Sequence, residues 1–229
     1  WGEAVRQGLL DTETFPSSGA TVFGKMLGGL NFFPVEVDPP MHSKYRAIIS
    51  PFFKPSAVNA LTGKIEKCVD DLLDNFVDKG ECEWNSEFAR ILPATIFLTM
   101  MGMPVERTQD FLDQARQILG RETKAEDKTA ALARVRDYLA SELRSRLEHP
   151  REDLLTALAH GEIDGRRISI DEATGGAMVL FTAGLDTVAN LLGWVFLQLA
   201  SDQEMQAGLR KDASQLSRVI EEMLRYFSP

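Results

Sequence analysis

The chain has 229 residues, and its 25 Lys and Arg against 34 Asp and Glu give a formal net charge of −9 and a pI near 4.9, which excludes a protein that wraps nucleic acid through bulk positive charge. Hydrophobic residues make up 44 % and charged residues 26 %, the composition of a globular chain and not of a disordered one. The two cysteines, Cys68 and Cys82, exclude a disulfide framework, show no metal-ligand spacing and favour a reducing compartment.

The two ends of the sequence have the character of internal segments. The chain opens on Trp1 within a polar helical pattern and closes on Tyr226-Phe227-Ser228-Pro229, directly after a predicted helix. No secretory signal is visible. We therefore expect residues 1–229 to be an internal piece of a longer protein.

Helical spacing of apolar residues dominates the first two thirds of the chain, and no segment shows sustained strand alternation. The pattern predicts helices over residues 55–79, 88–102, 104–119, 124–147 and 151–160. Gly80 ends the first of these, and Pro93 is expected to bend the second. The pair Asp164-Gly165 predicts a tight hairpin turn, the one confident strand signal. The sequence thus predicts one all-α domain, or most of one.

A long apolar helix is predicted over residues 170–200. Ser169 and Glu172 form a capping box at its start, and Asp186 is the one charged side chain between Ala173 and Ala200. Ser201 with Glu204 predicts a restart by the same box, and a last helix is predicted over residues 212–227. Residues 177–200 are long enough to span a bilayer, but Asp186 near the middle would cost roughly 2.5–3.5 kcal/mol there. A central helix buried on all sides is the other interpretation, and it leaves Asp186 unexplained.

The sequence around Asp186 predicts a break in this helix. Gly184 costs about 1 kcal/mol relative to alanine inside a helix, a buried unpaired carboxylate costs several more, and Thr187 can bend a helix by bonding back to a carbonyl. Gly184 allows close approach to the backbone, while Asp186 and Thr187 offer the parts of a proton relay. The alternative is a polar bridge to a neighbouring helix, without chemistry.

Three motifs occur in one order along the chain. They are Asp38-Pro39-Pro40-Met41-His42-Ser43-Lys44-Tyr45-Arg46 with Pro51-Phe52-Phe53, then Ala183-Gly184-Leu185-Asp186-Thr187, then Glu222-Met223-Leu224-Arg225. In this order they resemble the cytochrome P-450 haem-thiolate monooxygenases, most closely the soluble bacterial members that include the camphor-hydroxylating type. The resemblance implies a mainly α fold with one short β-hairpin, the central helical part of that family's fold. Residues 1–229 would be a single partial domain without the family's N-terminal sheet region and C-terminal cysteine loop.

The resemblance also implies a haem b site. His42 and Arg46 are four residues apart on one helix face, so a basic pair can hold two carboxylates, and in the family these positions meet the haem propionates. A solvated basic face is the alternative. The resemblance adds Phe53, Ala183, Gly184 and Thr187 to the haem-binding set.

The same resemblance assigns the chemistry. Ala183 and Gly184 would form the groove where O₂ sits, Thr187 would hydrogen-bond the bound oxygen, and Asp186 would feed protons from solvent. The reaction implied is insertion of one oxygen atom into a C–H bond.

Glu222 and Arg225 are implied to form a structural ion pair in a buried network. No metal ligand is predicted within the chain, because Cys68 lies on an apolar helix face and Cys82 lies in a polar loop; the axial cysteine is expected beyond Pro229.

The resemblance places six residues around the substrate: Leu30, Phe32, Phe33, Val179, Leu180 and Thr182. This apolar lining suggests a small to medium apolar substrate, terpenoid-like in character. Residues 38–54 carry a small basic patch, Lys44, Arg46 and Lys54 against Asp38, which would suit an acidic ferredoxin as electron donor; an ordinary solvated face is the alternative. We expect a cytoplasmic monomer that binds no nucleic acid and no membrane. A haem-free all-α ligand-binding module derived from the same fold remains the alternative function.

Overall fold

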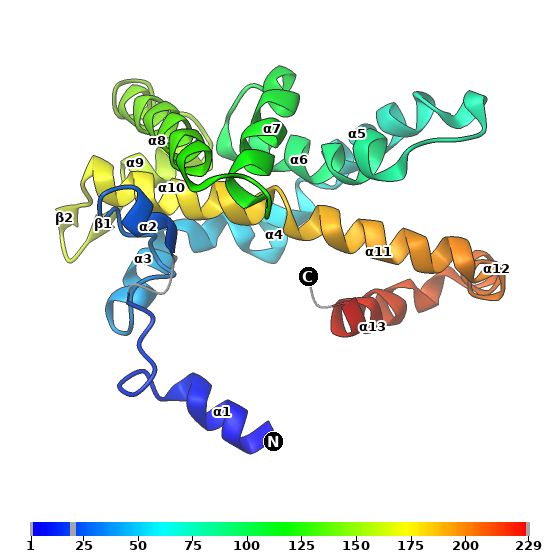
Figure 1. Ribbon diagram of the computed structural model, residues 1–229, viewed down its shortest axis with the longest axis horizontal. Helices are drawn as coiled ribbons and strands as arrows, with labels where there is room; N and C mark the ends of the chain where they lie inside the picture. Colours follow the sequence, from blue (N-terminus) through cyan, green and yellow to red (C-terminus); the bar gives the residue numbers. More distant parts are fainter. Residues whose placement is uncertain (1, 19–21, 228–229) are drawn as a thin grey trace.

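The computed structural model describes residues 2–18 and 22–227, so the terminal residues Trp1 and Pro229 named above lie outside the described part. The longer helices are α1 (Gly2–Leu10), α3 (Met41–Ile49), α5 (Thr62–Asp74), α6 (Ile91–Met101), α7 (Thr108–Leu119), α8 (Ala125–Glu148), α10 (Ile170–Gly184), α11 (Thr187–Ser201), α12 (Gln203–Lys211) and α13 (Leu216–Phe227). The short helices are α2 (Val22–Met26), α4 (Pro55–Asn59) and α9 (Leu154–Ala159), with the single turns η1 (Ser50–Phe53), η2 (Val77–Lys79), η3 (Asn85–Ala89), η4 (Val105–Arg107) and η5 (Ala213–Gln215). The predicted mainly α fold is confirmed (Figure 1).

The predicted hairpin is present as β1 (Glu162–Ile163) and β2 (Arg166–Arg167), an antiparallel pair in which Ile163 faces Arg166. Asp164 and Gly165 make its turn with φ of 53° and 76°. Positive φ at both positions is what a two-residue hairpin of this type requires, which is why aspartate and glycine suit it.

Helix α10 runs through the centre of the hydrophobic core. Helices α8, α9 and α7 pack around it (Figure 1). The fully buried core side chains include Leu132, Leu139 and Leu143 of α8, Leu154 and Leu155 of α9, and Met178 and Phe181 of α10. The hydrophobic effect of this burial holds α8 and α9 against α10.

A buried ion pair connects α8 and α9, two of the helices that pack against α10. Arg146 of α8 is completely buried, and its Nε donates to Asp153 Oδ2 at 2.8 Å while its Nη2 donates to the Gly102 carbonyl at 2.7 Å. Gly102 ends α6 with φ of 69°, and a side chain there would collide with the Asp153 carboxylate. One guanidinium thus joins α8, the start of α9 and the end of α6.

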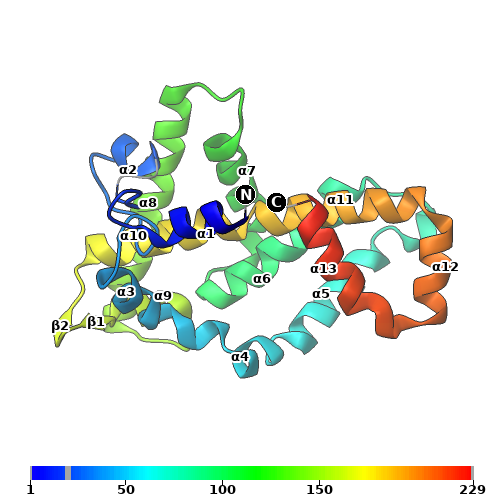
Figure 2. The same ribbon diagram turned by 90° about the horizontal axis from the view of Figure 1, so that it is seen from below.

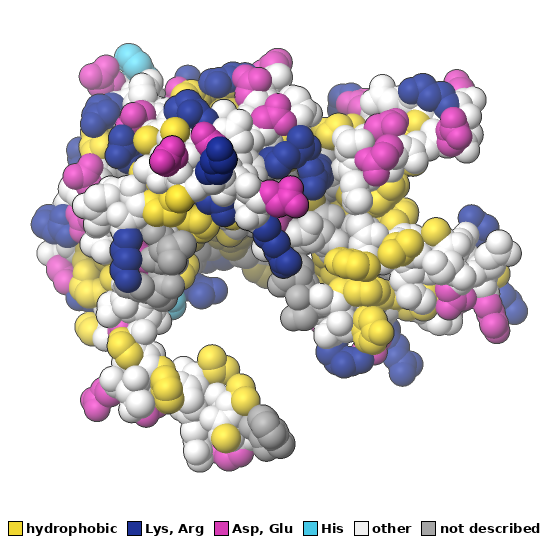
Figure 3. Space-filling model, in the orientation of Figure 1, with side chains coloured by type: hydrophobic (Ala, Val, Ile, Leu, Met, Phe, Trp, Pro, Cys, Tyr) yellow, Lys and Arg dark blue, Asp and Glu magenta, His cyan; other side chains and the backbone are white. Residues whose placement is uncertain are grey.

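Helix α11 continues α10 to the other end of the molecule, where α12 and α13 fold back beside it (Figures 1 and 2). Ala189 is the one residue of α11 classed as buried. Helix α1 has no buried residue and lies apart from the body in Figure 1. Large apolar side chains are exposed on α11 and α13, and Figure 3 shows them gathered in that region.

By length and composition alone, Ile170–Ser201 qualifies as a segment able to cross a membrane. Core helices of soluble proteins pass the same test, and the α10 half of this segment is such a core helix. The finding is therefore weak evidence for a membrane span.

Helix boundaries differ from the predictions at three places. The helix predicted over residues 55–79 divides into α4, α5 and η2, with the first division just before Gly63, the one glycine of the segment. The helix predicted over residues 88–102 starts as a π-turn at Asn85, where Arg90 N–H donates to the Asn85 carbonyl at 3.1 Å, because Pro93 lacks an N–H for the regular ladder. The residue that caps α12 is Asp202 and not Ser201, because Asp202 Oδ1 accepts the Met205 N–H while the Ser201 hydroxyl bonds back to Leu197.

Candidate active site

The predicted break in the central helix is present and separates α10 from α11 at Leu185 and Asp186. Leu185 ends α10, and Asp186 leaves helical geometry with φ of −120° and ψ of −41°. The capping box at the other end of α10 is also confirmed, with Ser169 and Glu172 bonded reciprocally. The long apolar segment is therefore two helices joined by a local interruption, and the interruption carries the carboxylate and the hydroxyl.

Two hydrogen bonds organise the interruption. The Thr187 hydroxyl donates to the Ala183 carbonyl at 2.9 Å, across the break. Asp186 Oδ2 accepts from the Asn190 side-chain amide at 2.9 Å, one turn further along α11. Asp186 is half-buried, whereas Thr187 is exposed. The two groups are adjacent, one toward the protein and one at its surface, which is the arrangement that a relay between solvent and a site requires.

The two residues predicted to form an oxygen groove face different surroundings. Ala183 is exposed, as the prediction requires. Gly184 instead packs against α6, where a side chain at this position would lie within 2.5 Å of the Phe97 ring. Successive residues on a helix are about 100° apart, so Ala183 and Gly184 point in different directions. The close approach that Gly184 permits is therefore that of Phe97.

Asp186 lines a small cavity of about 130 Å³ whose other polar members are Arg90, at the start of α6, and Arg116, near the end of α7. Leu112 and Leu185 supply its apolar wall. Among the described residues Asp186 forms no ion pair with either arginine. Sequence reasoning missed both arginines, which are distant in the chain and belong to no local motif, whereas the Asn190 contact follows from its spacing of four residues.

The predicted haem-binding residues of α3 and η1 are accessible. His42 is half-buried and Arg46 exposed on α3, and among the described residues neither side chain has an ion-pair or hydrogen-bond partner. Phe53 is 49 % exposed in η1. Two unpartnered basic groups, an exposed phenyl ring and an exposed alanine and threonine fit a flat apolar ring that carries two carboxylates.

Neither cysteine has the character of an iron ligand. Cys68 is half-buried on α5, and burial raises the pKa of its thiol, which disfavours the thiolate. Cys82 is exposed in the loop between η2 and η3. No group of three or more metal-ligating side chains occurs within residues 2–18 and 22–227.

The six predicted substrate residues do not share one cavity. Leu30 and Phe33 line a cavity of about 570 Å³, but Arg136, Asp171 and Glu172 line it too, so this lining is not purely apolar. Phe32 is buried in the core at 2 % exposure. The remaining three, Val179, Leu180 and Thr182, are half-buried on α10 outside that cavity, and the Thr182 hydroxyl is bonded to the carbonyls of its own helix.

The Glu222–Arg225 pair forms, with two hydrogen bonds of 2.6 and 2.8 Å, and Arg225 lowers the pKa of Glu222. Both side chains are exposed on α13, so the buried network expected around them is not found in the described part of the chain.

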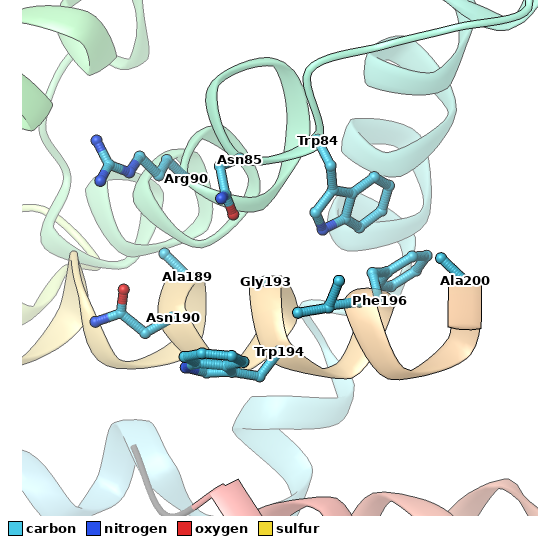
Figure 4. A pocket seen from close by; sticks show the side chains of 10 residues that line it. Trp84, Asn85, Arg90, Ala189, Asn190, Gly193, Trp194, Phe196 and Ala200 are labelled. Atoms are coloured by element: carbon cyan, nitrogen blue, oxygen red, sulfur yellow. The ribbon is translucent and has the colours of Figure 1, made fainter. Parts of the chain in front are cut away.

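Sequence reasoning also missed a groove of about 610 Å³ between η3 and α11. Figure 4 shows Trp84 and Phe196 at one end of it, where their rings stack with centroids 3.7 Å apart. The Trp84 Nε1–H is buried without a hydrogen-bond partner among the described residues. Trp194 also lines the groove, and its ring stacks on Phe227 of α13.

The architecture defines a class, namely helical proteins whose central core helix is interrupted at a carboxylate and a hydroxyl. Comparison with known proteins identifies the family. The family model described as Cytochrome P450 matches residues 90–229, more than half of the chain. The chain therefore belongs to the cytochrome P450 family.

The similar proteins are bacterial. Cytochrome P450 107B1 of Saccharopolyspora erythraea is 33 % identical, and the match covers 99 % of this chain and 59 % of that protein. Vitamin D(3) 25-hydroxylase of Pseudonocardia autotrophica is 31 % identical over 84 % of this chain and 48 % of its own length. The solved structure of the cytochrome P450 PksS from the Bacillus subtilis bacillaene polyketide synthase superposes with a TM-score of 0.80 at 30 % identity, over 85 % of this chain and 50 % of that one. The chain spans about half the length of these relatives.

Proposed function

We propose that this chain is the central helical part of a haem-dependent monooxygenase that inserts one atom of O₂ into a C–H bond of an apolar substrate. The observation that supports this most directly is the α10–α11 interruption, which places an exposed hydroxyl beside a half-buried carboxylate. That carboxylate, Asp186, is the one charged side chain between Ala173 and Ala200. A carboxylate in an apolar helix carries a desolvation cost, so its presence there points to a functional role.

Haem b, held by a thiolate, would supply the binding of O₂ and the cleavage of its O–O bond. His42 and Arg46 would hold its two carboxylates, and Phe53, Ala183 and Thr187 would contact its ring. Cys68 and Cys82 are unsuited as ligands, so we propose that the thiolate comes from outside residues 1–229. A haem-free ligand-binding module would need none of these features.

The protein's own part in the reaction is proton delivery. Because the Thr187 hydroxyl already donates its proton to the Ala183 carbonyl, its oxygen is free to accept a second hydrogen bond. Asp186 accepts one amide proton from Asn190 and keeps further lone pairs toward its cavity. In the relay that we propose, Asp186 would take up a proton from solvent and pass it to the Thr187 oxygen. The Thr187 hydroxyl would then break its bond to the Ala183 carbonyl and release its own proton at the exposed face.

Two substitutions test this assignment in the full-length gene product. Asp186→Asn keeps the Asn190 contact within reach but removes the base, so we expect turnover to fall roughly 100-fold with substrate affinity unchanged. Thr187→Ala should uncouple the reaction, so that reductant consumption continues while peroxide accumulates in place of product. Asn190→Ala is the matched control, because it removes the partner of Asp186 without removing a relay group. Wild-type turnover in Asp186→Asn would refute the relay.

The proposal extends to the substrate and the electron donor. The half-buried Val179 and Leu180 support an apolar substrate, terpenoid-like in character, although the cavity beside Leu30 and Phe33 also offers charged groups. Within the part of the chain that the structure describes, Lys54 is exposed and forms no ion pair, which supports docking of an acidic ferredoxin. We propose further that the enzyme is a cytoplasmic monomer. Lys54→Glu should raise KM for such a donor and leave the substrate KM unchanged, and Lys211→Glu on α12 serves as the control.

A further inference from the structure

The Glu172 carboxylate receives far more hydrogen bonds than a capping box needs. Besides the Ser169 N–H at 2.6 Å, it accepts two bonds from the Arg166 guanidinium at 2.8 and 2.9 Å and one from the Tyr45 hydroxyl at 2.5 Å. Arg166 belongs to the hairpin and Tyr45 to α3. One side chain at the start of α10 therefore joins three separate elements, and we name Tyr45, Arg166 and Glu172 the α3–α10 clamp.

Tyr45 is the member of the clamp that belongs to the basic helix. It lies between His42 and Arg46 in sequence, and it is buried at 8 % exposure. Its ring stacks on Phe33 with centroids 4.1 Å apart and an interplanar angle of 13°. A phenylalanine would fill the same space equally well, so packing alone does not account for the hydroxyl. Within the described residues the hydroxyl has one partner, Glu172.

The charges around this contact favour its formation. Burial and the neighbouring Glu172 raise the pKa of Tyr45 to about 12, while the Arg166 guanidinium holds the pKa of Glu172 far below its usual range. The phenol therefore stays a donor and the carboxylate an acceptor across the physiological range. Hydrogen bonds to a charged group are among the strong ones.

A second tie between the same elements is exposed. Lys44 of α3 pairs with Asp164 in the hairpin turn at 2.5 Å, but both side chains are more than a third accessible to solvent. Exposed ion pairs contribute little to stability, whereas the Tyr45–Glu172 contact is partly buried. Two adjacent residues of α3 therefore make contacts that can be compared directly. We expect the Tyr45 contact to hold α3 in place and the Lys44 contact to contribute little.

We propose that Tyr45 is a positioning residue, whose hydrogen bond to Glu172 fixes α3, and with it His42 and Arg46, relative to the start of α10. This proposal rests on the proposed function in one respect, namely that His42 and Arg46 hold the haem carboxylates. The clamp acts through α3 and contacts neither the haem nor the substrate.

The first experiment follows α3 itself in the full-length gene product without haem. Tyr45→Phe should accelerate hydrogen exchange of the α3 amides about tenfold and leave those of α8 unchanged, because the lost bond is local. Lys44→Gln should leave both unchanged. Acceleration spread evenly over the chain, or none in α3, would overturn the proposal.

The second experiment follows the haem. Transfer of haem to apomyoglobin should be about tenfold faster from Tyr45→Phe than from wild type, with Glu172→Gln acting in the same direction and the double variant less than additive. Rates within twofold of wild type would overturn the positioning role. If the wild-type protein takes up no haem at all, the proposed function fails, while the exchange experiment still decides whether the clamp holds α3.

The pH dependence separates the hydroxyl from simple packing. Because folding raises the pKa of Tyr45, its stabilisation is complete below the unfolded pKa near 10 and is lost as the pH rises through about 12. Among the residues that the structure describes, the charged groups that act on the hydroxyl are Glu172 and Arg166. The gap in melting temperature between wild type and Tyr45→Phe should therefore close between pH 10 and 12, and a gap that does not change with pH would contradict the proposal.

Discussion

Helices α10 and α11 have the same length and nearly the same apolar composition, yet they lie in opposite environments. Each has 15 residues. Helix α10 is enclosed by α8, α9 and the segment before α3, whereas α11 exposes Trp194 and Leu197 beside the groove at Trp84. An apolar composition therefore predicts that a helix is buried against other elements. The topology of the chain determines that α10 is buried in this way and that α11 is not. The polar interruption lies at the boundary between the two halves.

The largest expected difference is between the ion pairs of the two regions, one in the core around α10 and one on α13, which packs beside α11. Arg146→Met removes a completely buried guanidinium and leaves the Asp153 carboxylate buried without its partner, so we expect a loss of about 3–5 kcal/mol in the free energy of unfolding. Arg225→Met on α13 removes an exposed pair and should leave the unfolding midpoint unchanged within error. Denaturant titration of both variants measures the difference, and equal losses would contradict the contrast in burial.

A smaller difference in stability is expected when a glycine of α10 or a glycine of α11 is replaced by alanine. A side chain at Gly175 of α10 would lie 1.9 Å from the Asn31 carbonyl oxygen, a backbone atom that cannot move away cheaply. A side chain at Gly193 of α11 would meet only the end of the Asn85 side chain at 2.8 Å. Gly175→Ala should therefore destabilise by about 1–3 kcal/mol.

Gly193→Ala should be neutral or slightly stabilising, because alanine is the better helix former by about 1 kcal/mol and Asn85 can rotate away. Thermal unfolding of the two variants tests the pair. A larger loss at Gly193 than at Gly175 would mean that α11 is packed as closely as α10.

The smallest effect is expected at the exposed surface of α11. Leu197 is 57 % exposed, so Leu197→Ser should change the free energy of unfolding by no more than about 0.5 kcal/mol while it reduces the binding of a hydrophobic dye. Leu139→Ala in the α8 core is the reference, with an expected loss of about 2–5 kcal/mol. A loss at Leu197 comparable to that at Leu139 would show that its face is covered in solution.

The local features of the fold could be predicted from the sequence because neighbouring residues determine them. The capping box of Ser169 and Glu172, the turn at Asp164-Gly165 and the break near Asp186 each depend on a few adjacent residues, and each is present. The residue at which a helix begins was harder to predict, since Ser201 and Asp202 are adjacent and both can cap the start of α12.

The contacts that complete the site could not be predicted in this way. Tyr45 meets Glu172 across 127 positions in the chain, and Arg90 and Arg116 reach the cavity of Asp186 from two other helices. Spacing along the sequence carries no information about such pairs. The same limit explains Gly184, where the sequence indicates a close approach but not that Phe97 makes it.

The central claim, that the interrupted helix belongs to a haem-thiolate monooxygenase whose ligand is neither Cys68 nor Cys82, is tested most directly by one spectrum. The measurement is the carbon monoxide difference spectrum of the reduced full-length gene product, recorded for wild type and for the Cys68→Ser/Cys82→Ser double variant. We expect the red-shifted Soret band of a thiolate-bound haem in both. Absence of the band from the wild type would contradict the haem assignment, and its loss in the double variant alone would show that one of these two cysteines is the ligand.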